Sequence, residues 1–285
     1  MKFDEPMDRH TSFKIGGPAD IYVCPEDGDD LLNILRYAVS HKMDYFIIGG
    51  GSKLLVGDKG IRGFVISLGA PAFNGIEFDG VSAVAGCGIK IHELIKKAAE
   101  KDLGGLEFLS GIPGTLGGAL IMNAGWPSKA IGDLIEEITA LRDLEKVKLG
   151  EDEFKFSYRS SSLDGLILVS ARIKLEEKAK DKIEAETKKN LEKKRKTQEL
   201  GYPSVGSIFL NPSGSSPAWE IIDKCGLRGK SAGGATVSEK HANFIINRGK
   251  ASAADVRKLI DEIQKIVFKE HQIMLKLEAK LIGEF

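Results

Sequence analysis

Two glycine-rich loops constrain this sequence more than any other feature. The first starts after Ile48 and reads G-G-G-S-K-L-L-V-G; the second runs from Gly111 to Gly125 and reads G-I-P-G-T-L-G-G-A-L-I-M-N-A-G. Each places backbone without side chains beside an apolar run, as chains do where amides must approach and wrap a phosphate. Two such loops, about sixty residues apart, predict one long, phosphorylated, planar cofactor held between two small α/β units.

A strand, a helix and a second strand precede the first loop. Residues 21–23 predict a short strand, and residues 27–42 predict a helix with an apolar face made by Leu31, Leu32, Leu35, Ala38 and Val39. Tyr45 to Ile48 is an apolar strand that leads directly into the glycines, which completes a βαβ unit. A tight turn without a ligand is the alternative, but three consecutive glycines cost backbone entropy and pack nothing.

The rest of the chain predicts a strand-rich middle, a charged helix and a final lobe. Strand-like segments cover residues 64–68, 81–85, 139–149, 153–157 and 166–175, with a helix near residues 87–99. Residues 176–199 are dense in charge and predict a solvated helix between lobes, with a functional patch at residues 195–198 as the alternative. Beyond Gly201, Ser252 and Asp255 have the spacing of a helix-capping box, and Ile273 to Ile282 alternates like a strand.

Composition argues against several classes of function. Basic and acidic residues number 41 each, so the chain lacks the basic excess of most nucleic-acid-binding proteins. The three cysteines, Cys24, Cys87 and Cys225, lie far apart, which favours reduced cytosolic thiols over a disulfide framework. The spacing of cysteine and histidine gives little support for a metal site. The N-terminal residues have no signal-peptide core, and apolar runs fall short of the roughly 20 residues of a membrane helix.

Three polar residues are candidates for catalysis. Arg159 lies in S-Y-R-S-S-S, Ser207 in P-S-V-G-S-I-F-L-N-P, and Glu278 between two lysines near the C-terminus. Each also has a structural explanation: Arg159 as the partner of a surface acid, Ser207 as a strand-edge hydroxyl bonded to backbone, and Glu278 as an ion pair with its lysine neighbours. Spacing alone does not decide between these explanations. It also gives no hydrolase pattern, since Ser207 has no G-x-S-x-G context.

Six motifs, taken together in order, resemble one enzyme family. They are T-S-F-K-I-G-G-P-A-D, I-G-G-G-S-K-L-L-V-G-D-K-G, the second glycine loop, S-Y-R-S-S, G-S-I-F-L-N-P and V-S-E-K-H-A-N-F-I-I-N. Over about residues 13–283 they resemble the UDP-N-acetylenolpyruvoylglucosamine reductases, flavoenzymes of peptidoglycan precursor synthesis. The short connection between Arg159 and Ser207 is similar to the subclass that lacks an extra substrate-covering loop.

The resemblance implies an α+β fold with a vanillyl-alcohol-oxidase-like, two-lobed FAD-binding region followed by an α+β substrate-binding domain. The predicted domains are residues 1–64 and 65–177 for the two FAD-binding lobes, 178–200 for the charged connecting helix, and 201–285 for the substrate domain. The implied cofactors are FAD and, as hydride donor, NADPH. The implied FAD-binding residues are Gly49, Gly50, Gly51, Ser52, Lys53, Leu54, Gly111, Pro113, Gly114, Thr115, Gly117, Gly118, Asn123 and Gly125.

The resemblance also implies a two-step reaction. NADPH reduces the flavin and leaves, and the enolpyruvyl ether of UDP-N-acetylglucosamine then accepts the hydride at its vinyl carbon. Arg159 is the implied stabiliser of the charge that develops on the substrate carboxylate. Ser207 is the implied proton donor, and Glu278 is expected to bond the carboxyl side of the substrate.

Other implied substrate-binding residues are Tyr158, Arg195, Gln198 and Asn211. The sequence departs from the family pattern at Lys53, where Asn is common, at Leu210, where Lys is common, and at Trp126-Pro127 after N-A-G. The expected protein is a cytoplasmic monomer that binds a small-molecule substrate but no nucleic acid and no membrane. Two alternatives stay open: another flavin oxidase with the same FAD-binding fold, and a nucleotide-binding regulator without catalysis.

Overall fold

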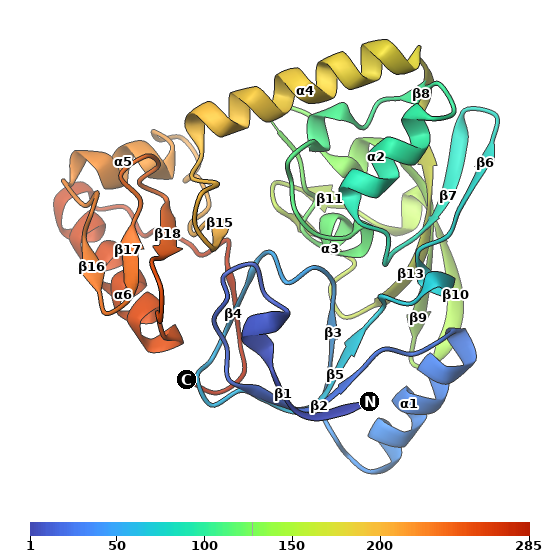
Figure 1. Ribbon diagram of the computed structural model, residues 1–285, viewed down its shortest axis with the longest axis horizontal. Helices are drawn as coiled ribbons and strands as arrows, with labels where there is room; N and C mark the ends of the chain where they lie inside the picture. The colour runs from blue at the N-terminus through green and yellow to red at the C-terminus, as the bar shows by residue number, and fades with distance from the viewer. Residues whose placement is uncertain (127) are drawn as a thin grey trace. The chain divides into compact units, whose positions relative to one another are not determined.

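The computed structural model describes residues 1–126 and 128–285 (Figure 1). These residues form two compact units. The first contains residues 1, 22–50 and 64–194, and the second contains residues 2–21, 51–63 and 195–285. Strands β2 (Pro18–Val23) and β5 (Ile61–Ser67) each begin in the second unit and end in the first. The domain boundaries expected from the sequence stay predictions.

The first unit contains a five-stranded antiparallel sheet in the order β10-β9-β13-β7-β6. Its strands are β6 (Ile76–Asp79), β7 (Ser82–Gly86), β9 (Ile135–Arg142), β10 (Glu145–Gly150) and β13 (Ile167–Lys174). The single strand predicted over residues 139–149 is wrong, because β9 and β10 form a hairpin there. Asp143 and Leu144 at its turn both have positive φ, 51° and 66°. That backbone matches the strand twist, but the usual Asn-Gly signal is absent.

Helices α2 (Ile91–Ala99) and α3 (Leu116–Ile121) lie against one face of this sheet (Figure 1). The apolar residues of α2 recur at helical spacing, and Ile91, Leu94, Ile95 and Ala98 are buried. They share one core with sheet residues such as Ala83, Ala85 and Ile138. The segment between β7 and α3 is therefore anchored on both sides, and the second glycine loop begins within it and continues through α3.

Helix α1 (Gly28–Ser40) and strand β3 (Tyr45–Ile48) lead into the first glycine loop. The Asp27 carboxylate caps α1 by accepting a hydrogen bond of 2.9 Å from the amide of Asp30. Val39 was expected on the buried face, but it is 52% exposed because it lies beside the stripe of Leu31, Leu35 and Ala38. Strand β3 pairs in parallel with β5, placing Tyr45 opposite Phe64.

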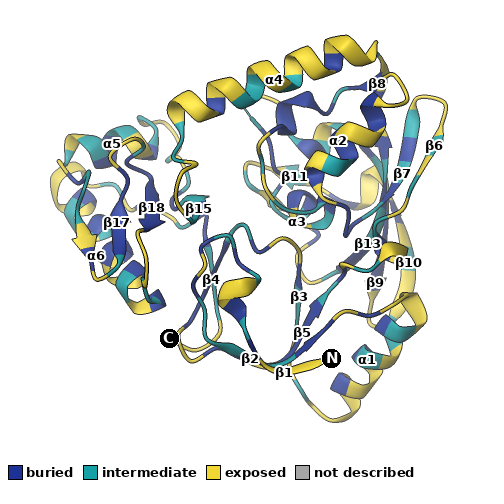
Figure 2. Cartoon of the chain, viewed as in Figure 1, coloured by how far each residue is buried: buried dark blue, intermediate teal, exposed yellow. Residues whose placement is uncertain are grey.

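Helix α4 (Lys180–Thr197) is exposed along most of its length (Figure 2), as its charge pattern predicts. Its buried residues are Ile183 and Lys194. The burial of Lys194, only 2% exposed, was not expected from so charged a helix.

The second unit contains a four-stranded antiparallel sheet in the order β15-β18-β17-β16. Its strands are β15 (Ser204–Ser207), β16 (Ser231–Ala232), β17 (Ala235–Val237) and β18 (Phe244–Asn247), and its helices are α5 (Ala218–Lys224) and α6 (Ala253–His271). The capping box that begins α6 is confirmed: Ser252 Oγ accepts from the Asp255 amide, and Asp255 Oδ2 accepts from the Ser252 amide, each at 3.0 Å. The apolar stripe of α6 packs into the core of this unit.

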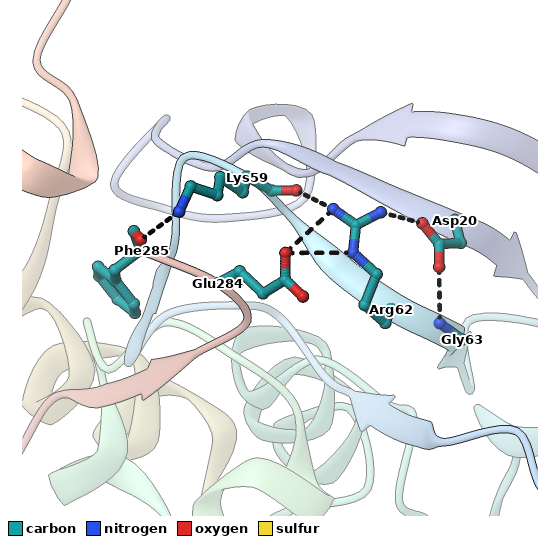
Figure 3. A network of polar contacts seen from close by, with 6 residues as sticks. All are labelled: Asp20, Lys59, Arg62, Gly63, Glu284 and Phe285. Carbon is teal, nitrogen blue, oxygen red and sulfur yellow. Dashed lines mark hydrogen bonds and ion pairs between the residues drawn. The ribbon is translucent and has the colours of Figure 1, made fainter.

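The C-terminal segment was expected to be one strand over residues 273–282, but strand β19 covers only Lys280–Ile282. It pairs in parallel with β4 (Leu54–Val56). Figure 3 shows how the end of the chain is held: Arg62 pairs with Asp20 at 2.7 Å and with Glu284 at 3.4 Å. Lys59 Nζ donates to the carbonyl oxygen of Phe285 at 3.1 Å. The segment that carries Glu278 is thus fixed at its far end.

Short elements complete the chain. They are β1 (Lys2–Pro6), η1 (Met7–Arg9), η2 (Pro71–Phe73), β8 (Leu103–Gly104), η3 (Glu107–Leu109), η4 (Ile131–Leu134), η5 (Glu151–Glu153), β11 (Phe156–Ser157), β12 (Ser160–Ser161) and β14 (Glu176–Glu177). Of the predicted strand at residues 153–157, only Phe156–Ser157 is strand. Within the described parts of the chain, every helix is too short or too polar to span a lipid bilayer.

Candidate functional site

The two glycine loops touch each other in the first unit. A Cβ added to Gly50 would stand 2.7 Å from Cα of Gly114, and a Cβ on Gly49 would collide with Oγ1 of Thr115. Gly111 and Gly114 have φ of 72° and 118°, a region that side chains disfavour. The glycines are therefore needed for contact between the loops and for their turns. Together they form one continuous surface of backbone.

Part of the second loop uses its amides within the protein. The amide of Leu116 donates to Ile89 at 2.9 Å, and that of Gly117 donates to Cys87 at 2.8 Å. The amide of Gly118 donates to Thr115 Oγ1 at 3.4 Å, which caps α3. Pro113 has no amide hydrogen to donate. The expected phosphate contacts of Gly117 and Gly118 are thus competing with these internal bonds.

The first loop continues into the second unit from Gly51 onwards. Gly51 has φ of 60°, and a Cβ there would collide with the carbonyl oxygen of His10. Its own carbonyl accepts a hydrogen bond of 3.2 Å from the amide of Ser12. Leu54 begins β4 and is buried. The backbone of Gly51 to Leu54 is thereby fixed against the N-terminal segment and β19.

Arg159 lies at the turn of a small hairpin in the first unit. Ser157 of β11 pairs with Ser160 of β12, so Tyr158 and Arg159 form the two-residue turn. Arg159 has φ of 54°, and its Nη2 donates a hydrogen bond of 2.8 Å to the carbonyl oxygen of Gly125. Its Cζ lies 5.3 Å from the centroid of the Tyr158 ring. A carbonyl oxygen and an aromatic ring thus both contact the guanidinium, and the alternative of an ion pair with a surface acid stays a prediction.

Asn123 connects the second glycine loop to this hairpin. Its side-chain amide donates to the carbonyl oxygen of Ser157 at 2.8 Å, and its Oδ1 accepts from the amide of Gly132 at 3.0 Å. Asn123 is buried. Asn123, which was expected near the cofactor, therefore also has a structural role, because it supports the turn that carries Arg159.

Ser207 and Glu278 are brought together in the second unit by Lys53. Lys53 Nζ donates a hydrogen bond of 2.8 Å to the carbonyl oxygen of Ser207 and lies 2.8 Å from Oε1 of Glu278. Glu278 was considered as an ion pair with its neighbouring lysines, and the structure shows an ion pair with the distant Lys53. The sequence could not indicate this contact, because the two residues are far apart in the chain.

The expected substrate-binding residues have different surroundings. Tyr158, Arg195 and Asn211 are exposed, and Gln198 is half-buried. Asn211 Oδ1 accepts a hydrogen bond of 3.0 Å from the amide of Ala218, which starts α5. The carbonyl oxygen of Arg195 accepts a hydrogen bond from Lys240 Nζ. Pro127, one of the departures from the family pattern, lies outside the described residues.

Sequence reasoning missed Lys194, a buried amine beside the second glycine loop. Its Nζ donates to the carbonyl oxygen of Ser110 at 2.6 Å and lies 5.5 Å from the centroid of the Trp126 ring. Burial, with a smaller effect of the Arg159 charge, lowers the pKa of Lys194 to about 8. The apolar spacing of α4 could have indicated this, because Lys194 follows Ile183 by eleven residues, close to three helical turns.

One group of side chains could hold a metal ion among the described residues: Cys225, Glu270 and His271, whose ligand atoms lie within 4.8 Å of one another. Burial, and then the hydrogen bond and charge of Glu270, raise the pKa of the Cys225 thiol to about 11. A metal ion needs the thiolate form. Binding a metal ion here would therefore release the proton of the thiol.

Comparison with known proteins gives two matching family models. The FAD binding domain matches residues 19–144, and the UDP-N-acetylenolpyruvoylglucosamine reductase C-terminal domain matches residues 198–282. A solved UDP-N-acetylenolpyruvylglucosamine reductase from Thermus caldophilus is 32% identical, with a TM-score of 0.85 over 98% of this chain and 97% of that chain. These matches confirm the predicted fold class, an FAD-binding region of the vanillyl-alcohol-oxidase type followed by an α+β domain.

Curated relatives match over nearly the whole length. The UDP-N-acetylenolpyruvoylglucosamine reductase of Geobacter metallireducens is 45% identical over 282 residues, which cover 99% of this chain and 93% of the relative. The enzyme of the same name from Caldanaerobacter subterraneus is 42% identical over 284 residues, with 99% and 93% coverage. The chain therefore belongs to the UDP-N-acetylenolpyruvoylglucosamine reductase family.

Proposed function

We propose that this protein is an FAD-dependent oxidoreductase that uses NADPH to reduce UDP-N-acetylglucosamine enolpyruvate to UDP-N-acetylmuramate, a step of peptidoglycan precursor synthesis. The observation that carries the proposal is the 45% identity to a reductase of this name over 99% of the chain. The FAD-binding and reductase-specific regions both match, so the similarity extends beyond the cofactor domain.

The backbone surface of the two loops fits the diphosphate of FAD, because amides can approach a phosphate closely where no side chain intervenes. We assign the contacts to Gly49–Leu54 and, in the second loop, to Gly111, Gly114 and Thr115, since the amides of Ile112 and of Leu116 to Gly118 donate within the chain. Gly117 instead brings α3 close to Cys87. When bound, FAD supplies the two-electron chemistry, a hydride transferred through its N5 position.

Arg159 is assigned to the substrate carboxylate. Negative charge grows there as the vinyl carbon accepts a hydride, and a guanidinium held in place stabilises that charge without reorganising. The hydrogen bond to Gly125 and the contact with the Tyr158 ring provide that fixation. Asn123 supports the turn from behind.

Ser207 is assigned as the proton donor to the carbon that bears the ether oxygen, and Glu278 as a contact to the carboxyl side of the substrate. A serine hydroxyl is a weak acid in water, so it serves this role only when held in contact with a strongly basic carbon. Strand β15 holds Ser207 opposite Phe244 of β18. Together the hydride and the proton saturate the vinyl group and complete the reduction.

Arg195, Gln198 and Asn211 are assigned to the diphosphate of the substrate, and Tyr158 to the pocket for the substrate and the nicotinamide. At Leu210 this chain lacks a cation that is common in the family, so the diphosphate has fewer charged partners. We further propose a monomer in the cytoplasm, where NADPH and nucleotide sugars are available.

The proposal is tested by stopped-flow measurement of the two half-reactions with FAD-loaded protein. In Ser207→Ala, NADPH should reduce the flavin at the normal rate, while reoxidation by the enolpyruvyl substrate slows by about 10²–10⁴-fold, the usual contribution of a positioned acid. Ser213→Ala, at an exposed position beyond the same strand, is the matched control and should behave as wild type. Equal slowing of both half-reactions contradicts the role of Ser207.

Two results on the wild type would contradict the function itself. Reduced protein that is reoxidised by oxygen but not by the enolpyruvyl substrate indicates an oxidase. Protein that stays colourless when FAD is added indicates a nucleotide-binding relative without flavin chemistry.

A further inference from the structure

The side chain of Lys53 reaches two residues that are assigned to the reaction. Its ammonium group lies 2.8 Å from the carbonyl oxygen of Ser207 and 2.8 Å from the Glu278 carboxylate. The Lys53 side chain is 24% exposed and the Glu278 side chain 9%. An ion pair at this depth is screened far less than one on the surface, so it fixes geometry more strictly.

The backbone already joins the segments that these residues occupy. The amide of Lys280 donates to the carbonyl oxygen of Lys53 at 2.8 Å, and the amide of Glu278 donates to the carbonyl oxygen of Ile208 at 2.8 Å. Strand β19 continues this contact by pairing with β4. The ammonium group is therefore not needed to hold the segments together, and its contribution lies in the charge and hydrogen bonds it offers to Ser207 and Glu278.

The local backbone of Ser207 brings its carbonyl oxygen to the amine. Gly206 has φ of 72°, and the pairing of β15 with β18 is irregular between Ser204 and Ser207. A Cβ on Gly206 would stand 3.6 Å from Lys53 Nζ. That distance is an ordinary van der Waals contact, so the glycine is required by its positive φ, which lets the strand bend at Ser207.

We propose that Lys53 is a positioning residue, whose ammonium group holds the main chain of Ser207 and the carboxylate of Glu278 where each acts on the substrate. The inference rests on the function proposed above. The substrate carries a carboxylate of its own, and a second buried carboxylate would repel it. The charge of Lys53 offsets that repulsion while its hydrogen bond orients the carbonyl group of Ser207.

The test compares Lys53→Met with wild type in the two half-reactions, using NADPH and the enolpyruvyl substrate. Flavin reduction by NADPH should be unchanged in the FAD-loaded variant, because the backbone of Lys53, and not its side chain, is assigned to FAD. Reoxidation by substrate should slow by about 10- to 100-fold, as expected when reacting groups are displaced slightly. Lys53→Arg, which keeps the charge and the donors, should recover much of the rate, and Lys53→Gln replaces the methionine variant if that variant does not fold.

Lys276→Met is the matched control, because Lys276 is an exposed lysine two positions before Glu278. It should leave both half-reactions unchanged. The double variant Lys53→Met, Glu278→Gln should lose less of the reoxidation rate than the product of the two single-variant losses. This is expected because Lys53 acts in part through Glu278.

The outcomes separate the two proposals. A wild type without substrate-driven reoxidation overturns the proposed function and this inference with it. If the wild type is reoxidised by substrate, three results would overturn the role of Lys53 alone. They are normal kinetics in Lys53→Met, equal slowing of its two half-reactions, or the same effect in Lys276→Met. Loss of rate in Lys53→Arg equal to that in Lys53→Met likewise excludes positioning by charge.

Discussion

Gly50 and Gly114 belong to different loops, yet a Cβ on Gly50 would stand 2.7 Å from Cα of Gly114. The neighbouring atom is backbone, so it cannot rotate away as the end of a side chain could. We therefore expect Gly50→Ala to force the loops apart, with a loss of about 1–3 kcal/mol in the free energy of unfolding. The purified variant should contain less flavin, measured by absorbance after denaturation.

Gly75→Ala provides the control for this substitution. Gly75 has no heavy atom within 4 Å of an added Cβ, so the same change should leave stability and flavin content as in wild type. Full flavin content in Gly50→Ala would show that the loop contact is dispensable for binding FAD.

Asn123 supports the Arg159 turn, and its removal should affect substrate reduction. Asn123→Gly keeps a backbone that tolerates φ of 41° but removes the bonds to Ser157 and Gly132. Both hydrogen bonds are partly buried, so losing each costs about 0.5–1.5 kcal/mol in the free energy of unfolding. Reoxidation by substrate should slow while NADPH-driven reduction persists, because the change acts on Arg159.

Asn123→Asp separates the two hydrogen bonds, since it keeps the acceptor for Gly132 and loses the donor to Ser157. It should resemble Asn123→Gly in the kinetic measurement if the Ser157 bond positions the turn. A wild-type oxidative half-reaction in both variants contradicts that support role.

Features that depend on residues close together in the sequence were predictable, and contacts between distant residues were not. Helix α6 was predictable because its capping box and apolar stripe are local, and the strands beside the loops were predictable from apolar runs. The contact of Lys53 with Glu278 was not, because it depends on how β4 and β19 pair. The family pattern indicated that Lys53 was unusual, but not what its side chain contacts.

The errors in secondary structure have similar physical causes. The β9–β10 turn uses Asp143 and Leu144 at positive φ without glycine, so no turn signal divides the segment. The alternation of residues 273–279 reflects packing against the core of the second unit, and Leu277 forms a single bridge with Phe209 in place of a strand. A segment can alternate between buried and exposed residues without pairing as a strand. The sequence indicates the alternation but not the pairing.

His241 should make the protein sensitive to acid. Burial lowers the pKa of His241 to about 4, and its Nδ1 is buried without a hydrogen-bond partner in the described part of the chain. Between pH 6.5 and 4 the unfolded chain binds a proton that the folded chain does not, so stability falls as pH decreases through this window. The loss in the free energy of unfolding from this titration is at most about 3 kcal/mol.

His241→Phe removes this titration and keeps a ring against Phe244, whose centroid lies 4.6 Å from that of His241. Urea denaturation of both proteins between pH 7 and 4 gives the difference between their free energies of unfolding. The contributions of the other titrating groups cancel in this difference. Parallel pH profiles would show that His241 is protonated in the folded protein as easily as in the unfolded chain.

Lys194 should produce a second pH-dependent change of the same sign, at alkaline pH. Burial first, and then the Arg159 charge, lower the pKa of Lys194 from 10.5 to about 8. Between these two values the unfolded chain holds the proton while the folded chain has released it, so the contribution of Lys194 to stability rises with pH from about 8 to 10.5. Lys194→Met keeps the length of the side chain and removes the charge. At a fixed pH, the effect of Lys194→Met on stability combines relief of the buried charge with loss of the hydrogen bond to Ser110.

The dependence of this effect on pH is therefore the decisive quantity, and chemical denaturation measures it. The free energy of unfolding of the wild type minus that of the variant should increase between pH 8 and 10. A constant difference would mean that Lys194 titrates normally.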